Sequence, residues 1–255
     1  MSKDANGANL LLGKGKVYFD RFTSAGAATG ERFLGNCERF EITTTDERVQ
    51  KHSSAEAAAP LLASAVTRRT PEVAITLDEF TKENIALVLM GDESALAQSA
   101  DSVTDEAHNG VKQGRYYKLA YRNVSSVVVT GEGGTPTYVL NTDYEVDAVT
   151  GRIYIVPDGS ITDDTNVLVS YDYAADTSAY VKGGSASKIE GSMRFKPDPS
   201  AGPKWEVEIW KVSISPDGAL ALIGEDYANA PLKAEILADS TNHPTEPLYR
   251  AIKIT

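Results

Sequence analysis

The sequence predicts a mainly β protein, and three observations support this. Hydrophobic and polar side chains alternate at period two in several segments, as in antiparallel strands with one buried and one solvated face. These segments are 39–43, 72–78, 188–195 and 232–236. In 205–214 the apolar positions change from odd to even numbers, which predicts a β-bulge near Ile209 and Trp210. Only one segment has the signals of a helix.

That helix is expected at residues 82–90. Thr81 can serve as its N-cap and Gly91 can end it. The side chains expected to face the sheet are Ile85, Val88 and Leu89. The helix therefore adds one flanking element to the β core.

The β pattern divides into a split core and an insertion. The core is expected over 1–110 and 177–255, and a separate series of strand-like runs over 111–176 predicts an inserted β domain. Its length of about 65 residues is small but sufficient for a domain that folds alone. Residues 43–70 have no sustained period, so they read as a long connection, and such connections are functional or disordered.

Composition narrows the class of protein. The 255 residues are 42% hydrophobic and 24% charged, which indicates a globular chain. The net charge of −11 argues against tight binding to phosphate backbones, which requires clustered Lys and Arg. Cys37 is the only cysteine, so an internal disulfide is excluded. Near Met1 the longest apolar run is three residues, so neither a signal peptide nor a membrane span is expected there.

Catalytic and metal-binding motifs are missing. His52, His108 and His243 lie in polar segments without further ligands nearby, which favours solvated loop histidines over a metal site. Residues 13–16 resemble part of a phosphate loop, but they lead into a strand instead of a helix. We therefore expect neither an enzyme nor a cofactor.

One acidic series leaves two interpretations open. Asn141, Asp143, Glu145 and Asp147 are spaced like the oxygen ligands of a calcium loop. Val146 stands where such a loop needs glycine, and the alternation favours the solvated face of a strand. Whether calcium binds near Asp143 stays open at this point.

Two blocks of sequence carry a family resemblance. Leu-Gly-Asn at 34–36 precedes Phe-Glu-Ile-Thr-Thr-Thr-Asp-Glu at 40–47. Val-Ser-Ile-Ser-Pro-Asp-Gly-Ala-Leu-Ala-Leu-Ile-Gly at 212–224 leads into Leu-Lys-Ala-Glu-Ile-Leu at 232–237, and Ser-Met-Arg-Phe at 192–195 fits the same pattern. These blocks resemble the major tail tube proteins of long, non-contractile bacteriophage tails. The resemblance covers about 10–91 and 188–255, and none of its motifs is catalytic.

The resemblance implies a β-sandwich or barrel-like core of two sheets with one flanking helix, and an immunoglobulin-like insertion. It also implies a virion structural protein, assembled in the host cytoplasm, whose hexameric rings stack into a tail tube. The implied partners are further copies of the chain and the tail terminator, tape measure and distal tail proteins, with no membrane. In the family, the segment corresponding to 43–70 reaches the next ring. The residues expected there are Thr45, Asp46, Glu47, Arg48, His52, Leu61 and Leu62.

Such a tube conducts double-stranded DNA during ejection. A negatively charged lumen would repel the phosphates, so DNA would pass without specific binding. The acidic side chains expected to face the lumen are Glu41, Glu72, Glu206 and Glu208.

Two alternatives remain. The tube could belong to a phage-derived particle such as a tailocin or a secretion apparatus. The chain could instead be a β-sandwich carbohydrate-binding or adhesion module that stacks sugars on strand aromatics. The aromatics in question are Tyr116, Tyr117, Tyr121, Tyr138 and Tyr154. Aromatics on strands more often form core or cross-strand pairs, which makes the module the weaker alternative.

Overall fold

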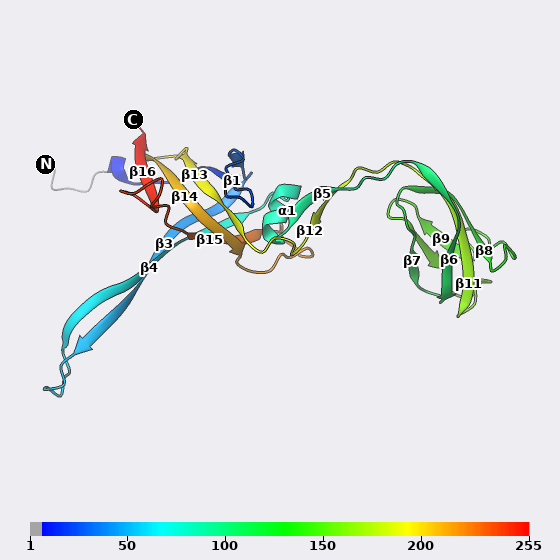
Figure 1. Cartoon of the computed structure of the whole chain (residues 1–255), viewed down its shortest axis with the longest axis horizontal. Helices are drawn as coiled ribbons and strands as arrows, with labels where there is room; N and C mark the ends of the chain where they lie inside the picture. Colours follow the sequence, from blue (N-terminus) through cyan, green and yellow to red (C-terminus); the bar gives the residue numbers. More distant parts are fainter. Residues whose placement is uncertain (1–6, 255) are drawn as a thin grey trace. The chain divides into compact units, whose positions relative to one another are not determined.

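The computed structural model describes residues 7–254. It is mainly β, with antiparallel sheets and one α-helix in the described part of the chain. The chain divides into two compact units: a core unit, formed by the residues up to Glu93 and from Val181, and an inserted unit, Ser94–Tyr180 (Figure 1). The insertion therefore begins earlier than the expected residue 111.

The core unit is built on an eight-stranded sheet. The order is β2-β1-β13-β14-β15-β4-β3, and β16 also pairs with β14. The strands are β1 (Gly15–Arg21), β2 (Arg32–Phe33), β3 (Cys37–His52), β4 (Leu61–Leu77), β13 (Ile189–Pro197), β14 (Lys204–Pro216), β15 (Ala230–Ile236) and β16 (Tyr249–Ile254). A short 3₁₀ helix, η1 (Gly7–Asn9), precedes them.

The expected bulge lies in β14. Gly191 pairs with Val212 and Met193 with Ile209, so β14 contains one residue more than β13 between these pairs. The prediction of a bulge near Trp210 is confirmed. Strand β14 pairs with β16 before the bulge and with β15 after it, so hydrogen bonding continues through one sheet. The expectation of two sheets in the core is wrong for this reason.

The apolar face of the sheet and helix α1 (Lys82–Val88) form the core. The Thr81 side chain accepts a hydrogen bond from the Asn84 backbone N–H at 3.2 Å, which confirms the N-cap. The buried residues of α1 are Asn84, Ala86, Leu87 and Val88. Leu89, expected to face the sheet, is exposed, because the inward stripe follows Asn84, Leu87 and Val88 at i, i+3, i+4 spacing.

The segment 43–70 is not an irregular connection. It belongs to the hairpin of β3 and β4, whose pairing continues from Cys37–Leu77 to His52–Leu61. We call residues 45–70 the arm, because its two strands pair only with each other, whereas 72–77 of β4 also pair with β15. Both faces of the arm are exposed, so no apolar face exists to impose a period-two pattern.

The inserted unit contains two three-stranded sheets, β7-β10-β9 and β6-β11-β8, around its own core. The strands are β6 (Asp101–Val111), β7 (Tyr116–Lys118), β8 (Val124–Gly131), β9 (Tyr144–Asp147), β10 (Arg152–Ile155) and β11 (Thr165–Tyr173). Strand β6 pairs along β11, and its mostly exposed side chains give the sequence no regular alternation there. A ribbon of β5 (Asp92–Ala95) and β12 (Ala179–Lys182) carries both crossings between the units.

Candidate interaction surfaces

The four candidate lumen glutamates share the polar face of the core sheet. Residues opposite each other on neighbouring strands point to the same face. Thr43 is opposite Glu72, and Glu72 opposite Glu235, which joins β3, β4 and β15. The face continues through the pairs Glu235–Ser213, Ser213–Glu190 and Arg194–Glu208. Glu41 and Glu206 lie two positions from Thr43 and Glu208 on their strands, so they lie on this face as well.

Each of these carboxylates has a cationic partner. The shortest N–O distances are 2.6 Å for Arg39–Glu41, 2.6 Å for Lys233–Glu72, 3.2 Å for Arg194–Glu206 and 2.7 Å for Arg250–Glu208. The hydrogen bond from Arg39 lowers the pKa of Glu41. Arg194 also contacts Glu31 and lies over the Tyr18 ring, 4.4 Å from its centroid. The four glutamates therefore give this face paired charges and no excess of negative charge.

The negative charge is concentrated in the insertion. Residues 94–180 contain 12 acidic and 5 basic side chains, a net charge of −7, and the rest of the chain carries −4. The overall acidity is therefore mainly a property of the smaller unit.

The predicted inter-ring residues all lie in β3 or β4, within the arm. Near its base, Asp46 bonds to Arg69 at 2.8 Å, and Glu47 lies 3.3 Å from Arg68 on the opposite strand. The hydrogen bond from Arg69 lowers the pKa of Asp46. Arg48 adds a second cation 3.4 Å from Asp46. These pairs join the two strands where the arm leaves the sheet.

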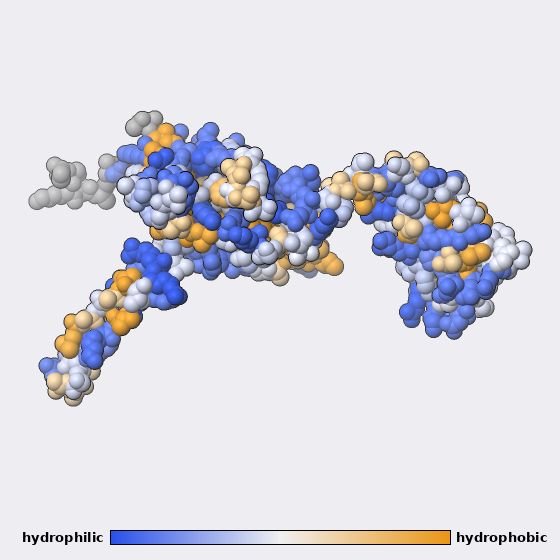
Figure 2. Space-filling model, in the orientation of Figure 1, coloured by the Kyte–Doolittle hydropathy of each residue, from blue (hydrophilic) through white to orange (hydrophobic). Residues whose placement is uncertain are grey.

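Farther along the arm, large apolar side chains are exposed. They are Val49, Leu61, Leu62 and Val66, of which Val49 and Leu62 are 63% and 65% exposed. Val49 is opposite Ala65 and Val66 is opposite Arg48, so apolar residues lie on both faces of the arm. Figure 2 shows this apolar surface along the arm, at the lower left of the view. None of the four packs against the core cluster.

The tyrosines of the inserted unit mostly serve its own packing. Tyr121 stacks on Tyr173 with ring centroids 3.8 Å apart, and Tyr116 lies 4.7 Å from Tyr154. Tyr138 is buried, and the Tyr117 hydroxyl accepts a hydrogen bond from the Lys112 backbone N–H at 2.6 Å. Tyr116 is the most exposed of the five candidate sugar-stacking residues.

Two of the three histidines are not solvated loop residues. His108 is half-buried on β6, with Nε2 3.2 Å from Glu106 Oε1. His243 stacks on Trp210, with ring centroids 3.7 Å apart. His52 is exposed at the end of β3, in the arm. Packing against Trp210 and pairing with Glu106 depend on tertiary contacts that the local sequence does not show.

The acidic series around Asp143 is engaged with the backbone. Asp143 is buried and accepts hydrogen bonds from the N–H groups of Ser160 at 2.7 Å and Val139 at 2.8 Å. The two backbone donors, first that of Val139, lower the pKa of Asp143. Asp147 accepts from Thr150 in the β9–β10 turn. Within residues 7–254, no three His, Cys, Asp or Glu side chains are grouped so that they could hold a metal ion.

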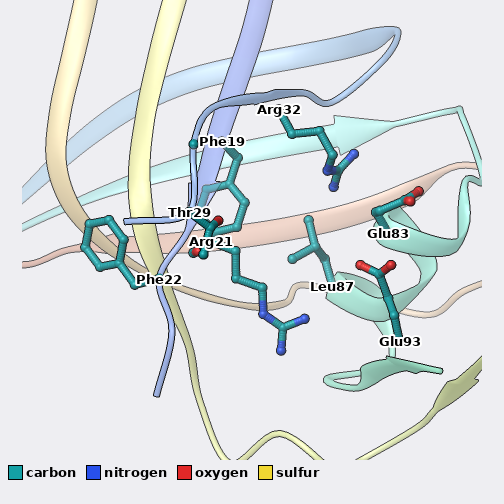
Figure 3. Close-up of a pocket in the computed structure, with 9 residues that line it drawn as sticks. Phe19, Arg21, Phe22, Thr29, Arg32, Glu83, Leu87 and Glu93 are labelled. Atoms are coloured by element: carbon teal, nitrogen blue, oxygen red, sulfur yellow. The ribbon is translucent and has the colours of Figure 1, made fainter. Parts of the chain in front are cut away.

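A small charged pocket lies where β1 and β2 meet helix α1 (Figure 3). It encloses about 260 Å³, and Arg21, Arg32, Glu83, Leu87 and Glu93 contribute to its lining. Arg32 donates to Asn84 Oδ1 at 2.9 Å and Arg21 to Asp92 Oδ1 at 2.8 Å. Burial lowers the pKa of Arg32, and nearby Glu83 and Glu93 oppose that shift. No His, Cys or Ser lines this pocket, and its polar contacts tie the helix to the sheet.

A larger, mostly apolar groove lies at the other end of the core unit's apolar face. It encloses about 490 Å³ between β1, β3, β13 and β14. Phe40 and Phe195 stack in its wall, with centroids 5.4 Å apart, and Trp205 lines it while remaining partly exposed. Cys37 also lines the groove, and burial raises the pKa of its thiol.

Together, the fold and these surfaces define a two-unit β protein with a protruding hairpin arm and an open apolar groove. The family model described as "Protein of unknown function UCP028589" matches residues 10–248, so the chain belongs to this family. The search of the curated proteins found no match. Across 7–254, no helix has the length and apolar character needed to cross a membrane.

Proposed function

We propose that this protein is a structural subunit that assembles with copies of itself, as a tail tube protein of a bacteriophage or of a phage-derived particle. Its hexameric rings would stack into a tube in the virion tail, and the core unit would have a tail-tube-like fold with an immunoglobulin-like insertion. The observation that carries this proposal is the arm: a regular hairpin with apolar side chains exposed on both faces.

The arm supports association because its own chain leaves its apolar side chains uncovered. Burying one Val or Leu side chain contributes about 1.5–3 kcal/mol, so covering Val49, Leu61, Leu62 and Val66 by a neighbour would stabilise an assembly substantially. The strand pairing already fixes the backbone, which lowers the entropic cost of ordering the arm on binding. Under the proposal, the arm bridges to the next ring.

The sheet edges also favour a closed ring. Strands β2 and β3 are the two ends of the core sheet path, and unpaired strand edges invite pairing with another chain. A cyclic arrangement of copies can cover such edges with identical contacts around the ring.

The polar face of the core sheet suits contact with DNA that must not bind. Its glutamates engage Arg39, Lys233, Arg194 and Arg250, so these four cations are not free to collect phosphates, and the unpaired lysines of this face, Lys16, Lys196 and Lys204, lie at one end of it. Clustered free cations are what produce salt-dependent adhesion to DNA. We propose this face for the lumen of the tube, with DNA passing along it, and we propose no catalytic activity.

Electron microscopy of the concentrated protein tests the proposal. We expect hexameric rings or hollow tubes for the full chain. Deleting 53–63, the end of the arm, should abolish stacking and leave the circular dichroism spectrum and melting temperature almost unchanged. Val149→Ser, at an exposed apolar side chain of the inserted unit, is the matched control and should still form tubes. Tubes from the deletion variant would contradict the role of the arm, and dispersed monomers that bind a glycan array would favour the adhesion module.

The lumen assignment has its own test. Replacing Glu206 and Glu208 by Lys adds two cations and leaves Arg194 and Arg250 with one carboxylate partner each, Glu31 and Glu246. Tubes of this variant should retain duplex DNA in a low-salt mobility-shift assay, and tubes of the unmodified chain should not. Equal retention by both would place this face away from the DNA.

A further inference from the structure

The loop between β14 and β15, residues 217–229, exposes large apolar side chains. Leu222, Ile223 and Tyr227 are 81%, 96% and 100% exposed. Leu220, near the start of the loop, packs against the core cluster and so anchors the loop. Three acidic residues, Asp217, Glu225 and Asp226, lie in the loop, and it contains no Lys or Arg. Neither Glu225 nor Asp226 forms an ion pair with another described residue. The loop is thus an apolar tip with unpaired negative charge.

The opposite end of β14 carries the complementary features. The apolar groove lies there, lined by Leu11, Phe195, Trp205 and Val207. The lysines gathered at this end, where β1 and β14 begin and β13 and β16 end, are Lys14, Lys16, Lys196, Lys204 and Lys253. None of the five forms an ion pair with any residue in 7–254.

Two of these lysines face each other directly. Lys16 is opposite Lys196 in the β1–β13 register, and both lie on the polar face of the sheet with Arg194, away from the groove. Lys14 lines the groove itself. The β3 wall of the groove carries Glu38 and the Arg39–Glu41 pair, so the unpaired positive charge at the groove is that of Lys14 and of Lys253, which is opposite the groove residue Trp205. An anionic partner in the groove would meet Lys14 and Lys253.

We infer that the β14–β15 loop of one copy docks into the apolar groove of a second copy, with Glu225 and Asp226 against the lysine end. This inference rests on the proposed function and names the surfaces through which the copies join. Leu222 and Ile223 enter beside Trp205 and Phe195, and the acidic pair meets Lys14 and Lys253.

The contact is heterologous, because the loop and the lysine end lie at opposite ends of a 13-residue strand. At about 3.3 Å per residue such a strand spans roughly 40 Å. No residue of the loop lines the groove of its own chain. A head-to-tail contact of this kind repeats from copy to copy, so it generates a ring when it closes and a filament when it does not.

A mixed cross-linking experiment tests the contact. One protein carries Cys37→Ser and Gly13→Cys, and the other carries Cys37→Ser and Ile223→Cys. Gly13 lines the groove and has open space for a side chain, so the change should not disturb folding. Mixing the two under mild oxidation should give a disulfide-linked heterodimer. Val149→Cys in place of Ile223→Cys is the matched control and should give none. Because the thiols are on different chains, a link within one chain cannot produce this band.

Charge reversal tests the electrostatic part. In the loop protein, Glu225→Lys with Asp226→Lys should lower the heterodimer yield about tenfold. Lys14→Glu with Lys253→Glu in the groove protein should restore it. In sedimentation, Leu222→Ser with Ile223→Ser should weaken association of the otherwise unmodified chain about 100-fold, because two apolar side chains lose their burial. Val149→Ser should leave association unchanged.

The outcomes separate this inference from the proposed function. Tubes without the heterodimer overturn the loop–groove contact and leave the proposed function standing. Homodimers of the Ile223→Cys protein alone would indicate loop-to-loop contact and also overturn it. If Lys14→Glu with Lys253→Glu removes binding to duplex DNA and leaves association unchanged, these lysines bind a polyanion and the inference fails. A chain that stays monomeric at every concentration contradicts both proposals.

Discussion

The β3–β4 hairpin has two halves with the same backbone pairing and opposite surroundings. In the sheet, Val73, Ile75 and Leu77 are almost completely buried, and Phe40 and Ile42 pack against the same core. In the arm, the apolar residues along the same strands are exposed. Pairing therefore continues where burial stops. Because tertiary burial supplies most of the stability of such elements, the sheet half holds the fold and the arm half gains little stability from its own chain.

The largest expected effect is a difference in the free energy of unfolding between alanine substitutions in the sheet half and in the arm. Ile75→Ala should lower the free energy of unfolding by about 3 kcal/mol, because it leaves a cavity in a packed core. Val66→Ala in the arm should change it by at most about 0.5 kcal/mol. Urea unfolding of the free subunit measures both. Equal losses would show that the arm packs against the core in solution.

A smaller effect is expected from the protonation of Asp46, which pairs with Arg69 where the arm leaves the sheet. The pKa of Asp46 is lowered by Arg69, so the carboxylate stabilises the folded arm above its unfolded pKa of about 3.9. This contribution is lost as the pH falls through the lower, folded pKa. A carboxyl-carbon NMR titration should therefore give a midpoint below 3.9 for Asp46, and arm amide signals should shift with it. Asp46→Asn should remove that transition from the amides. A midpoint at or above 3.9 would refute the pairing.

The smallest effect is expected for the exposed Glu47–Arg68 pair. Arg68→Ala should change the free energy of unfolding by less than about 0.5 kcal/mol, because exposed ion pairs contribute little. Urea unfolding at low and high salt checks this value. A loss above 1 kcal/mol would mean that Arg68 has a further contact in the free subunit.

The sequence predicted the elements in which one face is buried. The runs in β4, β13 and β15, the bulge in β14 and the Thr81 cap were all visible, because burial or capping demands particular residues at fixed spacing. The arm and β6 were not predicted as strands because both are largely exposed. An exposed strand does not need an apolar residue at every second position. An exposed strand is defined by its partner strand, and pairing between distant segments leaves little local signal.

The surfaces were predictable only in part. The common face of Glu41, Glu72, Glu206 and Glu208 follows from alternation and register. The cationic partners of these glutamates could not be predicted in this way. Glu72 pairs with Lys233 and Glu208 with Arg250 on neighbouring strands that are far apart in sequence. Leu222 and Ile223 lie in a block from which only the family resemblance was inferred, and their exposure is visible only in the fold.

The ribbon of β5 and β12 brings the two ends of the inserted unit together. The chain leaves the core unit on one strand and returns on its hydrogen-bonded neighbour, so the two points of insertion are adjacent. A short turn could replace residues 96–178 and close the ribbon into a hairpin without rerouting the core. The inserted unit can therefore be removed or replaced at this ribbon without changing the strand pairing of the core sheet.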